Sequence, residues 1–252
     1  MIRIITRSLT AFRFLTIIPF PGTSRSRDVP EEFAQSMAFF PLVGVAIGAG
    51  LVFIAEGLAG RTSCFLQATA LVVFWGWISG ALHLEGFVDA ADGFSAGPDK
   101  EKILAVMKDV HCGAKGVVAV VFLAALKIAL VHDICAGGRD AALVVIPALG
   151  RWAMVYAASL CPYGGKTKGL GAAFTKEAGS SALISSTVIL IIIGISLLRW
   201  NFFILMLLPV TFCSVAIVYL RKKLNGVTGD VLGALNEITE LFGLASILLW
   251  KT

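Results

Sequence analysis

Three carboxylates stand close together in the segment HLEGFVDAADGF, which covers residues 83–94. Glu85, Asp89 and Asp92 are spaced i, i+4 and i+7, and this spacing places all three on one face of a helix. Carboxylates stacked in this way repel one another unless a cation neutralises them. Mg²⁺ prefers such oxygen ligands and keeps positions for substrate phosphates. We therefore predict a divalent metal site here, and a solvated acidic face at a helix end is the plainer alternative.

The next polar segment, MKDVHCGAKG (107–116), offers further ionisable groups. Asp109 either completes the metal sphere or caps the N-terminus of the following helix. The role of His111 is left open, since a histidine at the membrane boundary is more often structural than catalytic. His83 lies two residues before Glu85, so its side chain points elsewhere on a helix, and we regard it as a weak candidate for proton transfer.

Two later loops have the composition of anion-binding or turn segments. CPYGGKTKGLGAAF (161–174) is rich in glycine, whose exposed backbone N–H groups bind anions, and Lys166 and Lys168 add positive charge. The alternative is that these lysines only mark a cytoplasmic loop, as the positive-inside rule predicts, and bind no ligand. NGVTGD (225–230) predicts a turn in which Asp230 either caps the next helix or acts as a ligand.

Four ionisable residues interrupt segments that otherwise look transmembrane: Lys127, Arg151, Glu237 and Glu240. At about 1.5 Å per residue, all four lie at similar depths of roughly 12 to 18 Å from the same membrane side. A charge at mid-membrane costs about 2.5–3.5 kcal/mol, so such residues pair or face a cavity. We predict that one of the two glutamates neutralises Arg151 or Lys127, either as a structural strut or beside the substrate.

The elements that position these groups are apolar helices. The chain has 252 residues, of which 58% are hydrophobic and 15% charged, and its mean hydropathy is +0.88. Apolar runs of this length must be helices in hydrocarbon, because the backbone can satisfy its hydrogen bonds only internally. We predict an all-α, polytopic bundle forming a single domain (1–252), with about seven spans near 34–58, 66–84, 116–133, 140–161, 181–198, 201–220 and 231–250.

Lysine and arginine predict the orientation of the bundle. Segments 1–33, 85–115, 162–180 and 221–230 carry five, four, three and three of them, whereas the alternate loops and the C-terminus carry one each. This positive-inside pattern places the N-terminus in the cytoplasm and the C-terminus outside. The interfacial segment 1–33, the acidic active-site loop 85–115 and the loops 162–180 and 221–230 then all face the cytoplasm. We expect a multi-pass protein of the cell membrane.

Several other classes of protein are disfavoured. The net charge of +5 comes without a basic stripe or a nucleic-acid-binding motif, so we expect no nucleic-acid partner. The five scattered cysteines lack the spacing of a disulfide framework or a zinc site. Arginines break the apolar residues at the N-terminus, which therefore lacks the core of a signal peptide.

Six segments in order resemble the cobalamin synthase family, the adenosylcobinamide-GDP ribazoletransferases. They are FLTIIPFPG (14–22), FFPLVGVAIG (39–48), GALHLEGFVDAADGF (80–94), MKDVHCGAKG (107–116), GRWAMVYAASLCPYGGKTKGLG (150–171) and NGVTGDVLGALNEITE (225–240). The family's acidic motif maps onto Glu85, Asp89 and Asp92, with Glu85 where aspartate is usual. Its DxxxGxxG pattern maps onto Asp109, Gly113 and Gly116, and its TGD onto 228–230.

The resemblance implies a Mg²⁺-dependent membrane enzyme of vitamin B12 assembly. Such enzymes join adenosylcobinamide-GDP to α-ribazole, or to α-ribazole 5′-phosphate, and release GMP. In this reaction an alcohol attacks a phosphorus atom whose leaving group is a nucleoside monophosphate. Metal ions bind the pyrophosphate oxygens, and a carboxylate takes the proton of the hydroxyl group. We assign metal binding to Glu85, Asp89, Asp92 and Asp109, and base catalysis to Asp92 or Asp230. The candidates for contacts with the phosphates or nucleotide are Lys166, Lys168 and Arg151.

Other functions stay open at this point. A CDP-alcohol phosphotransferase-like enzyme also places carboxylates on membrane helices, but its Ala-Arg pair after the first Asp-Gly is missing after Glu85-Gly86. A cation-coupled transporter favours midplane charges and inverted repeats, whereas the strongest cluster here lies at the membrane edge. A non-catalytic scaffold has no need for three carboxylates on one face. The bilayer is an expected partner, and assembly into a homo-oligomer is left open.

Overall fold

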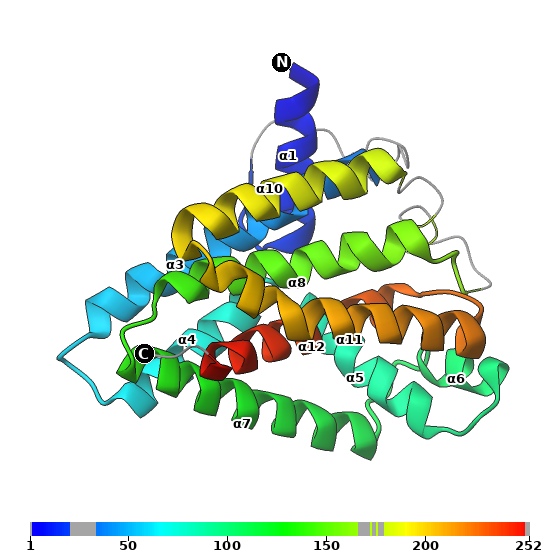
Figure 1. The fold of residues 1–252 in the computed structure, drawn as a ribbon. Coiled ribbons are helices and arrows are strands. Elements are labelled where there is room, and N and C mark those ends of the chain that lie inside the picture. Colours follow the sequence, from blue (N-terminus) through cyan, green and yellow to red (C-terminus); the bar gives the residue numbers. More distant parts are fainter. Residues whose placement is uncertain (1, 21–33, 166–171, 173–174, 176–178, 250–252) are drawn as a thin grey trace.

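Long apolar helices form the body of the molecule (Figure 1). The computed structural model describes residues 2–20, 34–165, 172, 175 and 179–249. Apart from one isolated bridge between Tyr163 and Val227, the regular structure of this part is helical, which confirms the predicted all-α class. The helices are α1 (Ile2–Leu15), η2 (Ser36–Phe39), α3 (Phe40–Leu58), α4 (Cys64–Ile78), α5 (Leu82–Ser95), α6 (Lys100–Val106), α7 (Ala114–Ala136), α8 (Ala141–Leu160), α10 (Ser180–Leu198), α11 (Asn201–Leu224), α12 (Gly229–Ser246) and η3 (Ile247–Leu249).

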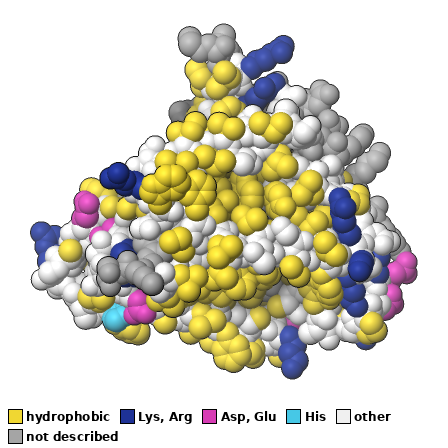
Figure 2. All heavy atoms as spheres, viewed as in Figure 1, with side chains coloured by type: hydrophobic (Ala, Val, Ile, Leu, Met, Phe, Trp, Pro, Cys, Tyr) yellow, Lys and Arg dark blue, Asp and Glu magenta, His cyan; other side chains and the backbone are white. Residues whose placement is uncertain are grey.

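The membrane spans agree with the predicted number. Among the residues that the structure describes, six segments are long and apolar enough to cross a bilayer, and they begin at residues 36, 114, 141, 180, 201 and 229. The pair α4 and α5 passes the same test together, which raises the count to seven if this bent pair is one span. Hydrophobic side chains form a broad band on the face shown in Figure 2, and charged side chains gather mainly towards its margins. The protein is a multi-pass membrane bundle.

One predicted span is not continuous. The expected helix at 66–84 ends at Ile78, and α5 begins at Leu82 after a bend of 89°. Gly80 and Ala81 both have positive φ, at 61° and 55°, a conformation that terminates a helix. The segment after α1 supports the break, because the backbone N–H of Ile17 donates to the carbonyl of Ile78 at 2.9 Å. Hydropathy indicates whether a segment is apolar enough to lie in the membrane, but it does not indicate the direction of the helix axis. It therefore could not predict this bend.

The segment 85–115, the predicted acidic active-site loop between two spans, is mostly helical, and its first part is the helix that the spacing of the three acids predicted. Residues 85–95 belong to α5, and α6 occupies Lys100–Val106. Asp99 caps α6, since its side chain accepts a hydrogen bond from the N–H of Glu101 at 3.1 Å. The acidic residues are therefore carried by a helix of defined direction.

Helix α8 lies at the centre of the bundle. In α8, 83% of the span is buried inside the protein, compared with 22% in the peripheral α7. Helices α3 and α8 are in backbone contact, because a Cβ atom on Gly44 or Gly48 would collide with backbone atoms of α8. Small residues four apart allow such close packing in a membrane. On the opposite side of α8 lies α12, and α12 in turn packs on α5. This stack positions the functional residues.

Helix α1 takes a different direction from the bundle. In Figure 1 it crosses the α10 ribbon at a steep angle, and its N-terminal end projects beyond the other helices. Its inner face is nevertheless well packed, since Ala11 and Leu15 are fully buried and Phe14 stacks on Phe40 with ring centroids 6.1 Å apart. The C-terminal end of α1 is thereby fixed against α3 and the α4–α5 break.

Candidate active site

Close packing of α5 on α12 brings acidic residues together. A Cβ atom on Gly86 would lie 2.9 Å from the carbonyl oxygen of Asp230, and one on Gly233 would lie 3.2 Å from the carbonyl oxygen of His83. Gly86 leaves no room for a Cβ atom and Gly233 leaves little, so these glycines allow the two backbones to approach closely. As a result, Glu85 and Asp89 of α5 face the first turn of α12, which carries Asp230.

These three carboxylates line one pocket of about 240 Å³. Asp230 lies close enough to Asp89 and Glu85 to interact with their charges, and Lys108 is the nearby cation. The rest of the lining comes from α1, α5, α8 and α12. It consists of glycines, the imidazole of His83 and hydrophobic side chains, namely Phe14, Leu82, Met154 and Leu232. The pocket thus combines an acidic wall with a hydrophobic surround, as expected of a small-molecule site.

Thr228 is the N-cap of α12, and this settles one of the open alternatives. The Thr228 hydroxyl accepts a hydrogen bond from the N–H of Val231 at 3.3 Å. Asp230 is the second residue of the helix and is not its cap. Its carboxylate is therefore available to the pocket.

Asp92 has a different position from the other two acids of α5. One of its carboxylate oxygens accepts a hydrogen bond from the N–H of Gly113, and the other accepts one from the N–H of Gly116, both at 2.8 Å. Asp92 thus caps the N-terminus of α7 and ties α5 to it. It is 9% exposed and is not among the residues that line the acidic pocket.

The same contact explains the two glycines of the DxxxGxxG pattern. A Cβ atom on either Gly113 or Gly116 would collide with the Asp92 carboxylate. Glycine at both positions leaves space for the acid to reach two backbone N–H groups at once. The pattern therefore marks a helix cap built by an acid 21 and 24 residues earlier in the chain.

Asp109 lies in an exposed turn and outside the acidic pocket. Its carboxylate accepts a hydrogen bond from the backbone N–H of His111 at 3.0 Å and contacts the His111 ring at 2.7 Å. These hydrogen bonds from His111 lower the pKa of the Asp109 carboxyl group below its usual value. Both side chains are largely exposed, at 56% for Asp109 and 87% for His111.

The acids do not form a ready-made cage for a metal. Within residues 2–20, 34–165, 172, 175 and 179–249, no three His, Cys, Asp or Glu side chains are grouped closely enough to hold an ion. A hard cation such as Mg²⁺ does not need one, because it is commonly bound by one or two carboxylates together with substrate phosphates and water. The oxygen ligands of Glu85 and Asp89 at an open pocket fit that mode of binding.

The loops before α12 and after α8 are joined, which the sequence did not reveal. The N–H of Val227 donates to the carbonyl of Pro162, and the N–H of Gly164 donates to the carbonyl of Val227, both at 2.9 Å. A Cβ atom on Gly226 would collide with Pro162, so the approach depends on glycine. The CPYGG and NGVTGD motifs therefore form one unit beside Asp230. Lys166 and Lys168 lie outside the described residues.

A buried ionic network lies deeper in the bundle and confirms the pairing predicted from membrane depth. The Lys127 ammonium donates to Glu237 at 2.5 Å and to Glu240 at 2.6 Å, and the Arg151 guanidinium pairs with Glu240. None of the four side chains is more than 6% exposed. Lys127 also lies over the ring of Trp75, 4.7 Å from its centroid. Two cations and two anions leave the network neutral.

Arg151 belongs to this network and not to the lining of the acidic pocket. It is fully buried, and its position on α8 lies one turn before Met154, which does line the pocket. The structure therefore gives Arg151 a partner on α12, and substrate contact by this residue stays a prediction.

His83 lies at the pocket, contrary to what helical spacing from Glu85 suggested. It is 1% exposed and lines the pocket, and its Nε2 atom has no hydrogen-bond partner among the described residues. The backbone before it turns sharply at Gly80 and Ala81, so α5 enters the site from its first residues onward. A buried ring nitrogen without a hydrogen-bond partner in this part of the structure is a polar atom that a ligand can satisfy.

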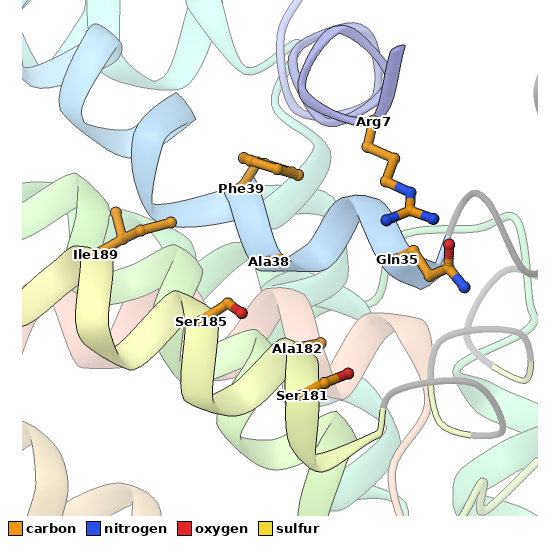
Figure 3. Close-up of a pocket in the computed structure, with 8 residues that line it drawn as sticks. All are labelled: Arg7, Gln35, Ala38, Phe39, Ser181, Ala182, Ser185 and Ile189. Atoms are coloured by element: carbon orange, nitrogen blue, oxygen red, sulfur yellow. The ribbon is translucent and has the colours of Figure 1, made fainter. Parts of the chain in front are cut away.

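A second pocket, of about 400 Å³, lies between α1, η2 and α10. Figure 3 shows the side chains of Arg7 and Gln35 on one side of it and those of Ser181 and Ser185 on α10 below. No carboxylate is among the residues that line it. Of these two pockets, the one between α5 and α12 therefore offers the ligands for a divalent cation.

Comparison with known proteins agrees with the motifs. A family model described as cobalamin-5-phosphate synthase matches residues 7–248. A protein of Syntrophobacter fumaroxidans named adenosylcobinamide-GDP ribazoletransferase is 36% identical over 94% of this chain and 96% of its own length. Proteins with the same name from Desulforamulus reducens and Alkaliphilus metalliredigens are 34% and 35% identical, over 95% and 96% of this chain and 94% and 95% of their own lengths. No solved structure matches the chain. The chain belongs to the cobalamin-5-phosphate synthase family.

Proposed function

We propose that this protein joins adenosylcobinamide-GDP to α-ribazole, or to its 5′-phosphate, and releases GMP. The relatives that match it over nearly their whole length carry the name of this activity. The observation that carries the proposal is one pocket that gathers Glu85, Asp89 and Asp230 beside a hydrophobic surround. The substrate carries a pyrophosphate next to a bulky corrinoid. The carboxylates would hold the cation that binds the pyrophosphate, and the hydrophobic residues would contact the corrinoid.

Glu85 and Asp89 are the residues that we assign to Mg²⁺. They stand one helical turn apart on α5 and line the same pocket, and Gly86 between them keeps the α12 backbone close. When bound, Mg²⁺ neutralises the charge of pyrophosphate oxygens and of the departing phosphate. The predicted roles of Asp92 and Asp109 as further ligands are less favoured, because Asp92 caps α7 and Asp109 lies in an exposed turn.

Asp230 is our candidate for the base. The ribazole hydroxyl group loses its proton to the Asp230 carboxylate as its oxygen forms a bond to the phosphorus on the cobinamide side. The bond from that phosphorus to the GMP oxygen breaks, and GMP leaves with the bonding electrons. The helix N-terminus that carries Asp230 orients backbone N–H groups towards this negative charge. His83, buried at the same pocket, is positioned to hydrogen-bond a bound substrate.

The site belongs on the cytoplasmic side of the cell membrane in this proposal. The positive-inside pattern supports that orientation, because the basic segments 1–33, 85–115, 162–180 and 221–230 fall on one side. Lys166 and Lys168, which follow α8 in the sequence, are proposed to contact the phosphates. Water-soluble nucleotide substrates reach the pocket directly from that compartment.

The experiment is a GMP-release assay on the purified full-length protein, with adenosylcobinamide-GDP, α-ribazole or its 5′-phosphate, and Mg²⁺. We expect turnover that chelation abolishes and added Mg²⁺ restores. Asp89→Asn should remove activity while the protein still folds, and Asp230→Asn should slow transfer by about 10²–10⁴-fold, the usual contribution of a general base. Glu56→Gln, an exposed acid on α3, is the matched control. Near-normal turnover by Asp89→Asn would refute the metal assignment, and absence of GMP from the unmodified protein would refute the function.

A further inference from the structure

A wholly apolar groove lies on the other side of α12 from the acidic pocket. It has a volume of about 360 Å³ and no polar lining, and it is formed by α11, α12 and the end of α5. Its residues include Phe94, Phe212, Val215, Tyr219, Ala234 and Ile238. The wall on α11 is exposed in the described structure, with Val215 at 65% and Tyr219 at 51%. Since α11 is a candidate membrane span, this surface faces hydrocarbon.

The apolar stripe of α11 continues directly into positive charge. Phe212, Val215 and Tyr219 follow one another at i, i+3 and i+7, and the next positions on the same face are Lys222 and Lys223. Lys222 is exposed, and the Lys223 ammonium donates to the carbonyl of Pro98 at 2.8 Å, between α5 and α6. The groove therefore ends at a pair of lysines that stand where α5 and α11 meet.

We propose that this groove binds an anionic phospholipid, with one acyl chain along the apolar stripe and the phosphate of the headgroup at Lys222 and Lys223. The occupant follows from the two-part lining, because an acyl chain suits a cleft without polar atoms and a lysine pair at the membrane boundary attracts anionic headgroups. A second copy of the chain fits less well. Two copies related by an axis along the membrane normal would bring both lysine pairs to the same depth, where like charges repel.

The position of the groove gives the lipid a connection to the acidic pocket. Asp230, Leu232 and Gly233 line the pocket, and Val231 and Ala234 line the groove. The first two turns of α12 therefore form a wall that is shared by the two cavities. An acyl chain in the groove packs against the reverse face of the helix turn that carries Asp230 and supports its position.

The test measures bound lipid on the full-length protein after reconstitution in bilayer nanodiscs of phosphatidylcholine alone or mixed with phosphatidylglycerol. Native mass spectrometry of the released protein then counts the retained lipids. We expect retained phosphatidylglycerol in preference to phosphatidylcholine. Replacing both lysines by glutamine should lower this preference roughly thirtyfold, as two lysines near an anionic headgroup imply.

Two further variants separate the groove from the charge. Ala216→Phe fills the groove without changing any charge and should abolish lipid retention. Ala125→Phe on the exposed face of α7 and Lys102→Gln on α6 are the matched controls and should retain lipid as the unmodified protein does. Unchanged phosphatidylglycerol retention by Ala216→Phe overturns the proposal. So does a photo-crosslinker at position 216 that labels a second protein chain instead of lipid.

Discussion

Replacing Glu240 by glutamine should destabilise the bundle more than any other single change in the buried network. Glu240 is fully buried and pairs with both cations, at 2.6 Å from the Lys127 ammonium and in contact with the Arg151 guanidinium. It also accepts a hydrogen bond from the side-chain amide of Asn236 at 3.1 Å. The substitution keeps the shape of the side chain but leaves two cations with one anion. A net positive charge then stays in the membrane interior.

The size of the effect follows from this excess charge. Removing one partner of a buried ion pair costs about 3–5 kcal/mol, because the remaining charge is left uncompensated. For a chain of this length, that loss corresponds to a fall of about 10 °C in the melting temperature. Glu237→Gln should cost less, since Glu237 pairs with Lys127 alone and Arg151 keeps its partner.

Thermal unfolding in detergent can be followed with a thiol-reactive dye, because Cys161 and Cys213 are buried and free in the folded protein. The double variant Lys127→Met/Glu237→Gln provides the sharper test. It removes one cation and one anion together, so its destabilisation should fall short of the sum of the two single variants by about 0.5–3 kcal/mol. Additive losses, or a Glu240→Gln melting temperature equal to that of the surface control Glu56→Gln, would refute the network as a charge-balanced unit.

Three other substitutions test the packing around the site. Gly116→Ala should lower stability by about 1–3 kcal/mol in the same thermal assay, because the new methyl group collides with the Asp92 carboxylate. Gly86→Ala should reduce GMP release at least about tenfold in a protein that still folds, since its methyl group lies 2.9 Å from the Asp230 carbonyl and displaces α5 from α12. Thr228→Ala should cost about 1 kcal/mol through the loss of the α12 cap, whereas Thr228→Ser should retain stability.

Much of the fold could be predicted because the membrane leaves few choices. The six continuous spans lie close to their predicted bounds, as hydropathy and backbone hydrogen bonding together require a helix in each apolar run. The ionic network was also accessible, since a charge in hydrocarbon needs an opposite charge at the same depth. Which cation meets which glutamate depends on helix rotation, and the sequence left that choice open.

The details of the site were less accessible, because they depend on contacts between distant segments. The i, i+4, i+7 spacing placed Glu85, Asp89 and Asp92 on one helical face, but that face extends for about 10 Å along the axis from Glu85 to Asp92. Asp92, two turns beyond Glu85, reaches the N–H groups of Gly113 and Gly116 at the start of α7, whereas Asp89 lines the pocket. One signal in the sequence was the pair of glycines at 113 and 116, which leaves space for an acid at the start of α7.

The break between α4 and α5 is the feature on which the site depends most. A straight helix through 66–84 would carry the following acids onward in the direction of the span, away from α12. The turn at Gly80 and Ala81 instead directs α5 along the first turns of α12, where two glycines allow backbone contact. Ala81 has a left-handed conformation that costs about 1–2 kcal/mol for a residue with a Cβ atom. The packing of α5 on α7 and α12 offsets this cost. The same packing that forms the acidic pocket therefore also stabilises the bend.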